Sequence, residues 1–339
     1  MPKNMIWKVA ILPGDGTGPE LVDASMKVLD AVMKKFKIKI GISFGEAGLH
    51  CIEKYGTNLP DKTVGLLKES DCVIKGPMTT PEGAGSQVSA AVKIRKMFDL
   101  YADVRPVKTI PGVESLKPGI DLVMVRENTE GMYSGLDFMV TKDMAVGLRV
   151  ITREGSRRIG RFALELAKTR KKHLTIVHKG NILKVSDALF KDTIMEEAKN
   201  YKQVVVDDAH VDAMSQWLIK NPQFYDVIVT ENLFGDILSD EASMIVGGIG
   251  TGPSANIGKD YAMFEPIHGS APKYAGMDRV NPIATIMSMK MMLDWMGYDK
   301  AAAAVESAVL ESIKIGIKTV DLGGDNKCSE VASEIAREI

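Results

Sequence analysis

Short apolar runs alternate along this chain with longer stretches in which apolar and polar residues recur at helical spacing. The apolar runs predict strands at residues 8–12, 71–75, 121–126, 174–178, 203–207 and 225–230. The amphipathic stretches predict helices at residues 20–36, 157–168, 184–200 and 211–220. Strands that alternate with helices in this way indicate an α/β fold.

Glycine and proline concentrate at four junctions, at residues 13–19, 76–85, 247–258 and 266–276. Ligands of α/β proteins usually bind at such loops. The first junction has glycines at 14, 16 and 18, and it matches neither the G-x-G-x-x-G nor the G-x-x-x-x-G-K-[ST] spacing. Its glycines suit a tight strand-to-helix turn, with Pro19 in the first helical turn, as well as they suit ligand contact.

The composition narrows the class of protein. The chain has 339 residues, of which 45% are hydrophobic and 26% charged, and its formal charge is −1; these values indicate a globular chain of two domains. Near-neutrality argues against a nucleic acid partner. No apolar run approaches the roughly 20 residues of a membrane span, and the N-terminal apolar stretch is too short for a signal peptide. We therefore expect a cytoplasmic protein without membrane association. Cys51, Cys72 and Cys328 lack C-x-x-C spacing, which predicts reduced, structural thiols.

Two carboxylates, Asp236 and Asp240, follow the apolar run 225–230 and are four residues apart. If Gly235 opens a helix, both point the same way and repel each other, so the pair needs a counterion. Hard oxygen ligands suit Mg²⁺ or Mn²⁺. The alternative for such a pair is a solvated helix face.

Three arginines form a second group of candidate site residues. Arg95, Arg105 and Arg126 could bind carboxylates bidentately, and together with a divalent metal they would suit a small polyanionic substrate. Each taken singly could instead form a surface ion pair. Arg126 is harder to explain in that way, because it ends an apolar strand and leads into the polar loop 127–133.

Six motifs in this order give the chain a specific resemblance. They are GDGTGPE at 14–20, DLY through RP at 99–106, RENTE at 126–130, VHKGN at 177–181, NLFGDILSD at 232–240 and EPIHG at 265–269. Together they resemble the β-decarboxylating dehydrogenases, the family of isocitrate, 3-isopropylmalate, homoisocitrate and tartrate dehydrogenases, from about Val9 to the C-terminus. The resemblance implies a large open-sheet domain (1–98 and 247–339), a smaller α/β domain (99–246) and a clasp at about 131–149. It also implies an obligate homodimer or higher homo-oligomer with shared active sites.

The resemblance further implies metal-assisted oxidation of a 2-hydroxy acid, followed by loss of its β-carboxylate as CO₂. Asp236 and Asp240 match the family's metal ligands, and Asp212 matches the ligand that the neighbouring subunit donates. Lys179 and Tyr133 match the acid/base pair, whose pKa values we expect a nearby cation and the metal to lower. The three arginines match the clamps that hold the carboxylates of the substrate.

The segment 86–95 bears on the identity of that substrate. Ser89 lies where isocitrate enzymes place a serine that binds the γ-carboxylate, and residues 76–81 also resemble those enzymes. We therefore expect isocitrate. Ala91 stands where isocitrate dehydrogenases usually have asparagine, so 3-isopropylmalate and homoisocitrate remain alternatives, with Lys93 as a polar group for the longer homoisocitrate.

The resemblance assigns the cofactor to residues from several segments. They are Thr79, Asn181, Glu265, His268, Gly269, Ser270, Ala271, Lys273, Tyr274, Val280 and Asn281. Lys273 replaces the aspartate that NAD enzymes of the family use for the ribose hydroxyls, and a lysine can pair with a 2′-phosphate. With Tyr274 and Val280 it predicts a preference for NADP, with NAD used more weakly. The loop 319–324 lacks the tyrosine and arginine that strengthen phosphate binding in bacterial NADP enzymes.

Two other functions compete with this one. A noncatalytic regulatory subunit of the same fold is disfavoured because the catalytic, metal-binding and arginine positions are all retained. A Mg²⁺-dependent phosphoryl-transfer enzyme is disfavoured because the phosphate-loop signatures are missing.

Overall fold

The computed structural model describes residues 6–81, 83 and 85–339. Its strands are β1 (Trp7–Leu12), β2 (Ile40–Phe44), β3 (Cys72–Lys75), β4 (Ala102–Lys108), β5 (Asp121–Glu127), β6 (Asp137–Thr141), β7 (Met144–Gly147), β8 (His173–His178), β9 (Val205–His210), β10 (Val227–Thr230), β11 (Pro253–Ile257) and β12 (Ala262–Pro266). Its α-helices are α1 (Gly18–Phe36), α2 (Leu49–Tyr55), α3 (Asp61–Glu69), α4 (Ala90–Met97), α5 (Arg153–Thr169), α6 (Ser186–Ala198), α7 (Val211–Lys220), α8 (Asn232–Ile245), α9 (Ile283–Trp295), α10 (Asp299–Lys314) and α11 (Cys328–Glu338). Every predicted strand and helix is present with shifted ends, and the α/β class is confirmed.

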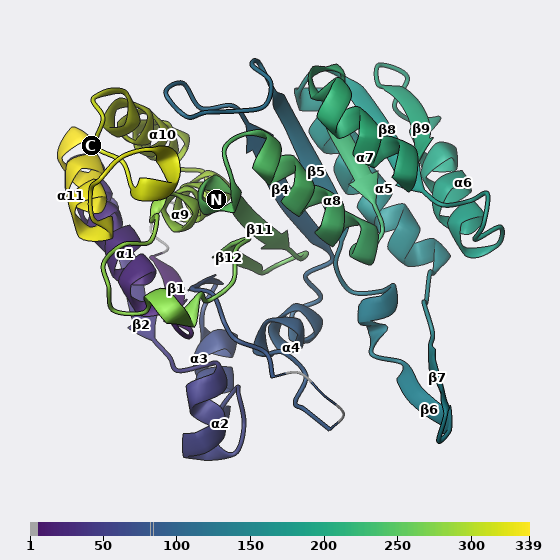
Figure 1. Ribbon diagram of the computed structural model, residues 1–339, viewed down its shortest axis with the longest axis horizontal. Coiled ribbons are helices and arrows are strands. Elements are labelled where there is room, and N and C mark those ends of the chain that lie inside the picture. Colours follow the sequence, from purple (N-terminus) through teal and green to yellow (C-terminus); the bar gives the residue numbers. More distant parts are fainter. Residues whose placement is uncertain (1–5, 82, 84) are drawn as a thin grey trace.

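Across the described residues, the main sheet has ten strands in the order β2-β1-β3-β12-β11-β4-β5-β10-β8-β9 (Figure 1). Neighbouring strands run parallel except at the centre, where β12, β11, β4 and β5 pair antiparallel in turn. The first five strands of this order come from residues 1–98 and 247–339, and the last five come from residues 99–246. The proposed domains would therefore meet where β11 pairs with β4.

The alternation of side chains along β5 and β10 shows how the sheet is covered on both faces. Val123 and Val125 pack with Val227 and Val229 against α5 and α6. The intervening residues Leu122, Met124 and Ile228 pack against α7 and α8 on the other face. Side chains of a strand alternate between faces, so these continuous apolar runs are what a sheet buried on both sides requires.

The other half of the sheet is covered in the same way. Helices α1, α9, α10 and α11 cover one face, and α3 and α4 cover the opposite face (Figure 1). The paired strands β6 and β7 project as a hairpin from the end of the molecule that carries residues 99–246. Four large apolar side chains of this hairpin are exposed: Phe138, Met139, Val140 and Met144.

Two observations concern the cysteines and the helices of the chain. Cys51, Cys72 and Cys328 are all buried and free, which confirms the expectation of reduced, structural thiols. None of the helices in the described part of the chain is long and apolar enough to cross a membrane.

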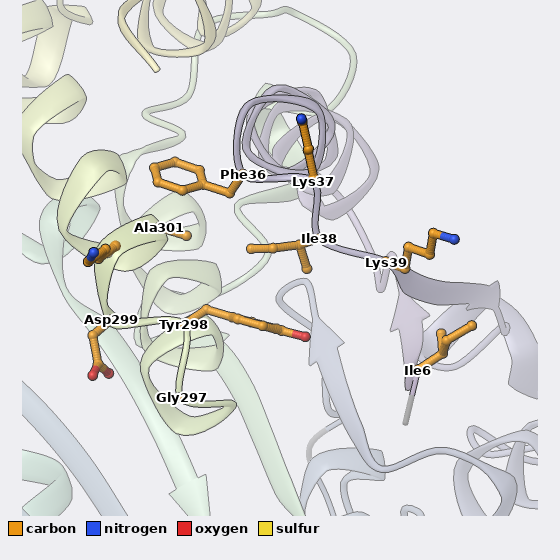
Figure 2. A pocket seen from close by; sticks show the side chains of 10 residues that line it. Ile6, Phe36, Lys37, Ile38, Lys39, Gly297, Tyr298, Asp299 and Ala301 are labelled. Atoms are coloured by element: carbon orange, nitrogen blue, oxygen red, sulfur yellow. The ribbon is translucent and has the colours of Figure 1, made fainter. Parts of the chain in front are cut away.

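A surface cavity of about 690 Å³ lies between the residues after α1 and the start of α10, where Phe36, Ile38 and Tyr298 face a common space (Figure 2).

Candidate active site

Four cationic side chains from four different elements meet in a cavity of about 360 Å³. Lys75 is the last residue of β3, Arg95 lies in α4, Arg105 in β4 and Arg126 near the end of β5. Arg126 is only 1% exposed and Arg105 only 6%. Neither is a surface ion pair, and the predicted convergence of the three arginines is observed.

Lys75 is a residue of this cavity that the sequence analysis missed. Its ammonium lies 2.6 Å from Glu265 Oε2, and Arg95 Nη2 donates a hydrogen bond of 2.8 Å to Glu265 Oε1. Burial opposes the charged form of this carboxylate, but the two cations hold the pKa of Glu265 far below its usual range. The sequence could have indicated Lys75 as a site residue, because it ends an apolar strand. Arg126 was identified from the same kind of position, one residue before the end of β5.

Asp103 and Asp236 neutralise Arg105 and Arg126. Arg105 Nε donates to Asp103 Oδ2 over 2.9 Å, and Arg105 Nη2 lies 3.3 Å from Asp236 Oδ1. Arg126 Nη1 also pairs with Asp236, while its Nε and Nη2 donate to Asn232 Oδ1 over 3.0 and 2.7 Å. These bonds fix the orientation of both guanidinium groups before any substrate arrives.

Helix α8 begins at Asn232, not at Gly235 as the sequence analysis supposed. Glu231 caps it, accepting hydrogen bonds from the backbone N–H groups of Leu233 and Phe234. A Cβ atom at position 235 would lie 2.6 Å from Arg126 Cγ. Gly235 is therefore needed for the close approach of Arg126 to the first turn of α8, and not for starting the helix.

Asp236 and Asp240 lie on one face of α8, as predicted. Arg105 reaches both, with distances of 3.3 Å to Asp236 Oδ1 and 3.5 Å to Asp240 Oδ1. Burial works against ionisation of Asp236, but Arg126 and Arg105 hold its pKa below the usual range. Burial and the neighbouring Asp236 charge raise the pKa of Asp240 against the influence of Arg105. Arg105 and Arg126 thus supply positive charge beside the pair, and the expected divalent cation stays a prediction.

Tyr133 lies in the short 3-10 helix Met132–Ser134 and lines the same cavity. Its Oη donates a hydrogen bond of 2.6 Å to Asp236 Oδ2, and the Arg126 guanidinium carbon lies 5.0 Å from the ring centre. Burial raises the pKa of Tyr133 by more than Arg126 lowers it. The expected lowering of this pKa involves a bound metal as well as the arginine, so it stays a prediction; in the chain alone, the phenol donates to a carboxylate, and that bond favours its protonated form.

Helix α4 contributes a mixed wall to the cavity. Ser89 precedes the helix and makes no capping hydrogen bond, so its hydroxyl is available to a ligand. Ala91 and Val92 line the cavity with small apolar side chains. Lys93 does not line it: its ammonium donates 2.7 Å to Asn58 Oδ1 on another side of the helix, which rules against a role for Lys93 in binding a longer acid.

A second cavity, of about 580 Å³, adjoins the first. Its lining includes six residues predicted for the cofactor: His268, Gly269, Ala271, Tyr274, Val280 and Asn281. His268 and Gly269 line both cavities, so a ligand in one can reach the other. Burial, assisted by the Lys75 charge, lowers the pKa of His268 against a backbone hydrogen bond, which favours a neutral imidazole.

Other predicted cofactor residues lie close by in different roles. Thr79 and Ser270 form a 2.6 Å hydrogen bond between their hydroxyls and tie two loops together. Glu265 belongs to the first cavity. The Lys273 ammonium lies 4.7 Å from the ring centre of Tyr274, which lines the second cavity, but Lys273 is not itself among the lining residues.

Two charged residues of the second cavity were not predicted. Arg279 lines it, and so does Asp321, which accepts hydrogen bonds from Asn281 Nδ2 over 2.9 Å and from Thr319 Oγ1 over 2.6 Å. Arg279 directly precedes two predicted residues, so its proximity could have been inferred. Asp321 lies in the loop 319–324, which the resemblance already connected with cofactor binding, but its hydrogen bond to Asn281 joins residues forty positions apart and was not predicted.

Lys179, Asn181 and Asp212 line neither cavity. Lys179 and Asn181 follow β8, and Asp212 lies in the first turn of α7. Lys179 Nζ donates 2.5 Å to Asp212 Oδ1, and Asp212 is 61% exposed. Both charged groups are therefore beside each other on the outside of the chain, where a second molecule could meet them.

A divalent cation would find an incomplete donor set in one chain. Asp236 and Asp240 supply hard oxygen ligands on one helix face, which suits Mg²⁺ or Mn²⁺. Within the residues that the structure describes, no cluster of three histidine, cysteine or acidic side chains could hold a metal ion. The residues fit such a cation if a third ligand comes from a second copy.

Comparison with known proteins gives consistent results. The family model for isocitrate/isopropylmalate dehydrogenase matches residues 8–335. The chain is 42% identical to the 3-isopropylmalate/3-methylmalate dehydrogenase of Methanocaldococcus jannaschii, and the match covers 98% of both chains. It is 43% identical to the homoisocitrate dehydrogenase of the same organism, again over 98% of both. The crystal structure of isocitrate dehydrogenase from Methylococcus capsulatus superposes with a TM-score of 0.94 at 41% identity, covering 98% of this chain and 99% of that one.

Proposed function

The chain belongs to the isocitrate/isopropylmalate dehydrogenase family, and we propose that it oxidises and decarboxylates a 3-alkylmalate such as 3-isopropylmalate or 3-methylmalate. The observation that carries this choice is the wall of the cationic cavity. Ala91, Val92, Met78 and Ile267 are among its lining residues, and an alkyl substituent suits such surfaces better than a third carboxylate does. The earlier expectation of isocitrate is not supported over this alternative.

Isocitrate or homoisocitrate is the second candidate. The free hydroxyl of Ser89 and the ammonium of Lys75 could both bind an additional carboxylate. Overall identity does not decide between the substrates, because relatives named for each of them match this chain to nearly the same degree.

The residues of the cationic cavity have separable roles in the proposed reaction. Arg95, Arg105 and Arg126 would bind the carboxylates of the substrate, and their existing bonds keep them oriented. Tyr133 keeps its proton on Oη, 2.6 Å from Asp236, and could deliver that proton to the enol carbon after CO₂ leaves. The neutral imidazole of His268 lines both cavities and would lie between the substrate and the cofactor.

Two groups that the chain would bind supply the remaining chemistry. A divalent cation held by Asp236, Asp240 and Asp212 of the partner subunit would stabilise negative charge on the substrate oxygens. A nicotinamide cofactor in the second cavity would accept the hydride. We propose NADP, with NAD used more weakly, on the basis of Lys273 and Tyr274; Arg279 adds a positive charge to the lining of the cavity that Tyr274 also lines.

We propose a homodimer in which each subunit completes the active site of the other. Lys179 and Asp212 support this arrangement, because they lie outside both cavities of their own chain. The exposed apolar hairpin β6–β7 supplies a surface that a second copy could cover, and so do the exposed Ile237 and Met244 of α8. Buried, reduced cysteines in such an enzyme suit a cytoplasmic location.

The test is a panel of substrates assayed with Mg²⁺ and each nicotinamide cofactor. We expect the highest kcat/KM with 3-isopropylmalate or 3-methylmalate, and we expect Ala91→Leu to favour 3-methylmalate over the bulkier 3-isopropylmalate. Ser89→Ala should weaken isocitrate turnover more than turnover of the alkylmalates. If isocitrate or homoisocitrate has the highest kcat/KM, then Ser89 and Lys75 decide the substrate and the alkylmalate proposal is wrong.

A further inference from the structure

Arg149 occupies a position between two carboxylates that the proposed reaction does not use directly. It lies between the hairpin β6–β7 and helix α5, and its side chain is 13% exposed. Its Nη1 donates 2.5 Å to Asp187 Oδ1 and 3.1 Å to Ser186 Oγ, and its Nε lies 3.5 Å from Glu231 Oε2. Asp187 and Glu231 are both almost fully buried, so each needs the cation.

Each of these carboxylates also holds a functional segment. The second oxygen of Asp187 accepts the backbone N–H of Lys179 over 2.5 Å, which fixes the turn that carries the Lys179 side chain. Glu231 caps α8, the helix that carries Asp236. Arg149 therefore connects the turn of Lys179 to the start of a rigid helix.

The ring of Phe234, in the first turn of α8, lies against the same guanidinium, 5.3 Å from its central carbon. Arg149 Nε and Nη2 are buried and make no hydrogen bond within the described part of the chain. The position of the guanidinium consequently depends on its contacts with Asp187, Ser186, Glu231 and this ring. A lysine at 149 would keep the charge, but it could not span both carboxylates as the planar guanidinium does.

We propose that Arg149 is a positioning residue for Lys179: it anchors Asp187 to the capped end of α8 and thereby fixes the backbone from which Lys179 enters the partner's active site. This inference rests on the proposed function, because it takes Lys179 to act in the other subunit. The effect of Arg149 should accordingly appear in the partner's site and not in its own. Misplacement of a catalytic group by about 1 Å can cost about 100-fold in rate.

Hybrid dimers test this directly. A Lys179→Met subunit paired with an Asp236→Asn subunit should keep one intact site, because each site takes Asp236 from its own chain and Lys179 from the partner. This hybrid is the reference, and its activity tests the shared site separately. If the reference stays inactive while both parent dimers form, the shared site is wrong, and the action of Arg149 across the interface is wrong with it.

Arg149→Lys is then placed on one subunit of the reference hybrid at a time. On the Asp236→Asn subunit, which supplies Lys179 to the working site, we expect kcat to fall about 10- to 100-fold with little change in KM. On the Lys179→Met subunit, which supplies the arginines, Tyr133 and α8 to that site but not Lys179, we expect kcat to change by less than about twofold. A merely structural role would not produce this difference between the two placements.

Two controls complete the experiment. Arg153→Lys, at an exposed arginine of α5 that lies 3.9 Å from Glu196, should leave kcat unchanged in either placement. Melting temperature and light scattering of each hybrid show that it is folded and dimeric. Equal losses in the two placements of Arg149→Lys, a loss confined to the Lys179→Met subunit, or no loss at all would overturn the inference.

Discussion

Replacing Glu265 by glutamine should destabilise the chain strongly, although the change adds no volume and keeps a hydrogen-bonding group. Glu265 is the counter-charge of two cations, Lys75 at 2.6 Å and Arg95 at 2.8 Å, and Lys75 is only 3% exposed. Removing one partner of a buried ion pair costs about 3–5 kcal/mol, because the remaining charge stays buried. The side-chain amide of glutamine cannot replace that charge.

The expected shift in melting temperature follows from the size of the chain. An unfolding entropy of about 2.1 cal/mol/K per residue gives about 0.7 kcal/mol/K for 339 residues, so a loss of about 3–5 kcal/mol lowers the melting temperature by about 4–7 °C. Differential scanning calorimetry of the ligand-free protein measures this shift. Glu46→Gln is the matched control, because Glu46 pairs with Lys54 on the surface and should shift the melting temperature by less than about 1 °C.

The pH dependence of the shift provides a second check. Burial disfavours the charged carboxylate, but Lys75 and Arg95 lower the pKa of Glu265 in the folded state. Its stabilisation is therefore complete above the ordinary glutamate pKa of about 4.3 and is lost as pH falls toward the lower folded pKa. The difference between wild type and Glu265→Gln should stay constant from about pH 8 to 5 and shrink at lower pH. If Glu265→Gln melts like Glu46→Gln at pH 7, the account of the buried cluster is wrong.

Three further predictions follow from the site. Lys273→Asp with Tyr274→Ile should shift kcat/KM toward NAD, and an unchanged cofactor ratio would contradict the assignment of NADP. Tyr133→Phe should lower kcat by about 100-fold or more, because the proton donor beside Asp236 is lost, and steady-state assays of the folded variant measure this. Replacing the hairpin 137–147 by a short flexible linker should yield an inactive monomer in analytical ultracentrifugation; an active monomer would contradict the shared site.

Local features of the fold could be predicted from the sequence where one segment carries the signal. The apolar run at 121–126 identified the strand β5, which the structure buries on both faces, and the placement of Arg126 near its end identified a site residue. The start of α8 was misplaced because Gly235 resembled a helix start, whereas it is glycine because Arg126 packs against it. That reason lies 109 residues away in the sequence and becomes visible only in the fold.

Features that depend on distant segments could not be predicted. The antiparallel pairing of β11 with β12 and β4 brings Ser254, Glu265 and Asp103 to the centre of the sheet, and no local pattern encodes that order. The pairing of Arg95 with Glu265 joins residues 170 positions apart. Lys93 was an alternative polar group for homoisocitrate, and the sequence did not show that Asn58 would hold it away from the cavity.

The most direct test of the central claim is the stoichiometry of the reaction. Purified protein is incubated with 3-isopropylmalate, NADP⁺ and Mg²⁺, and reduced cofactor and CO₂ are measured in the same vessel, with and without EDTA. The account predicts equal amounts of both products and the loss of both when EDTA removes the cation from the site that includes Asp236 and Asp240. Reduced cofactor without CO₂, or full activity in EDTA after removal of bound metal, would contradict it.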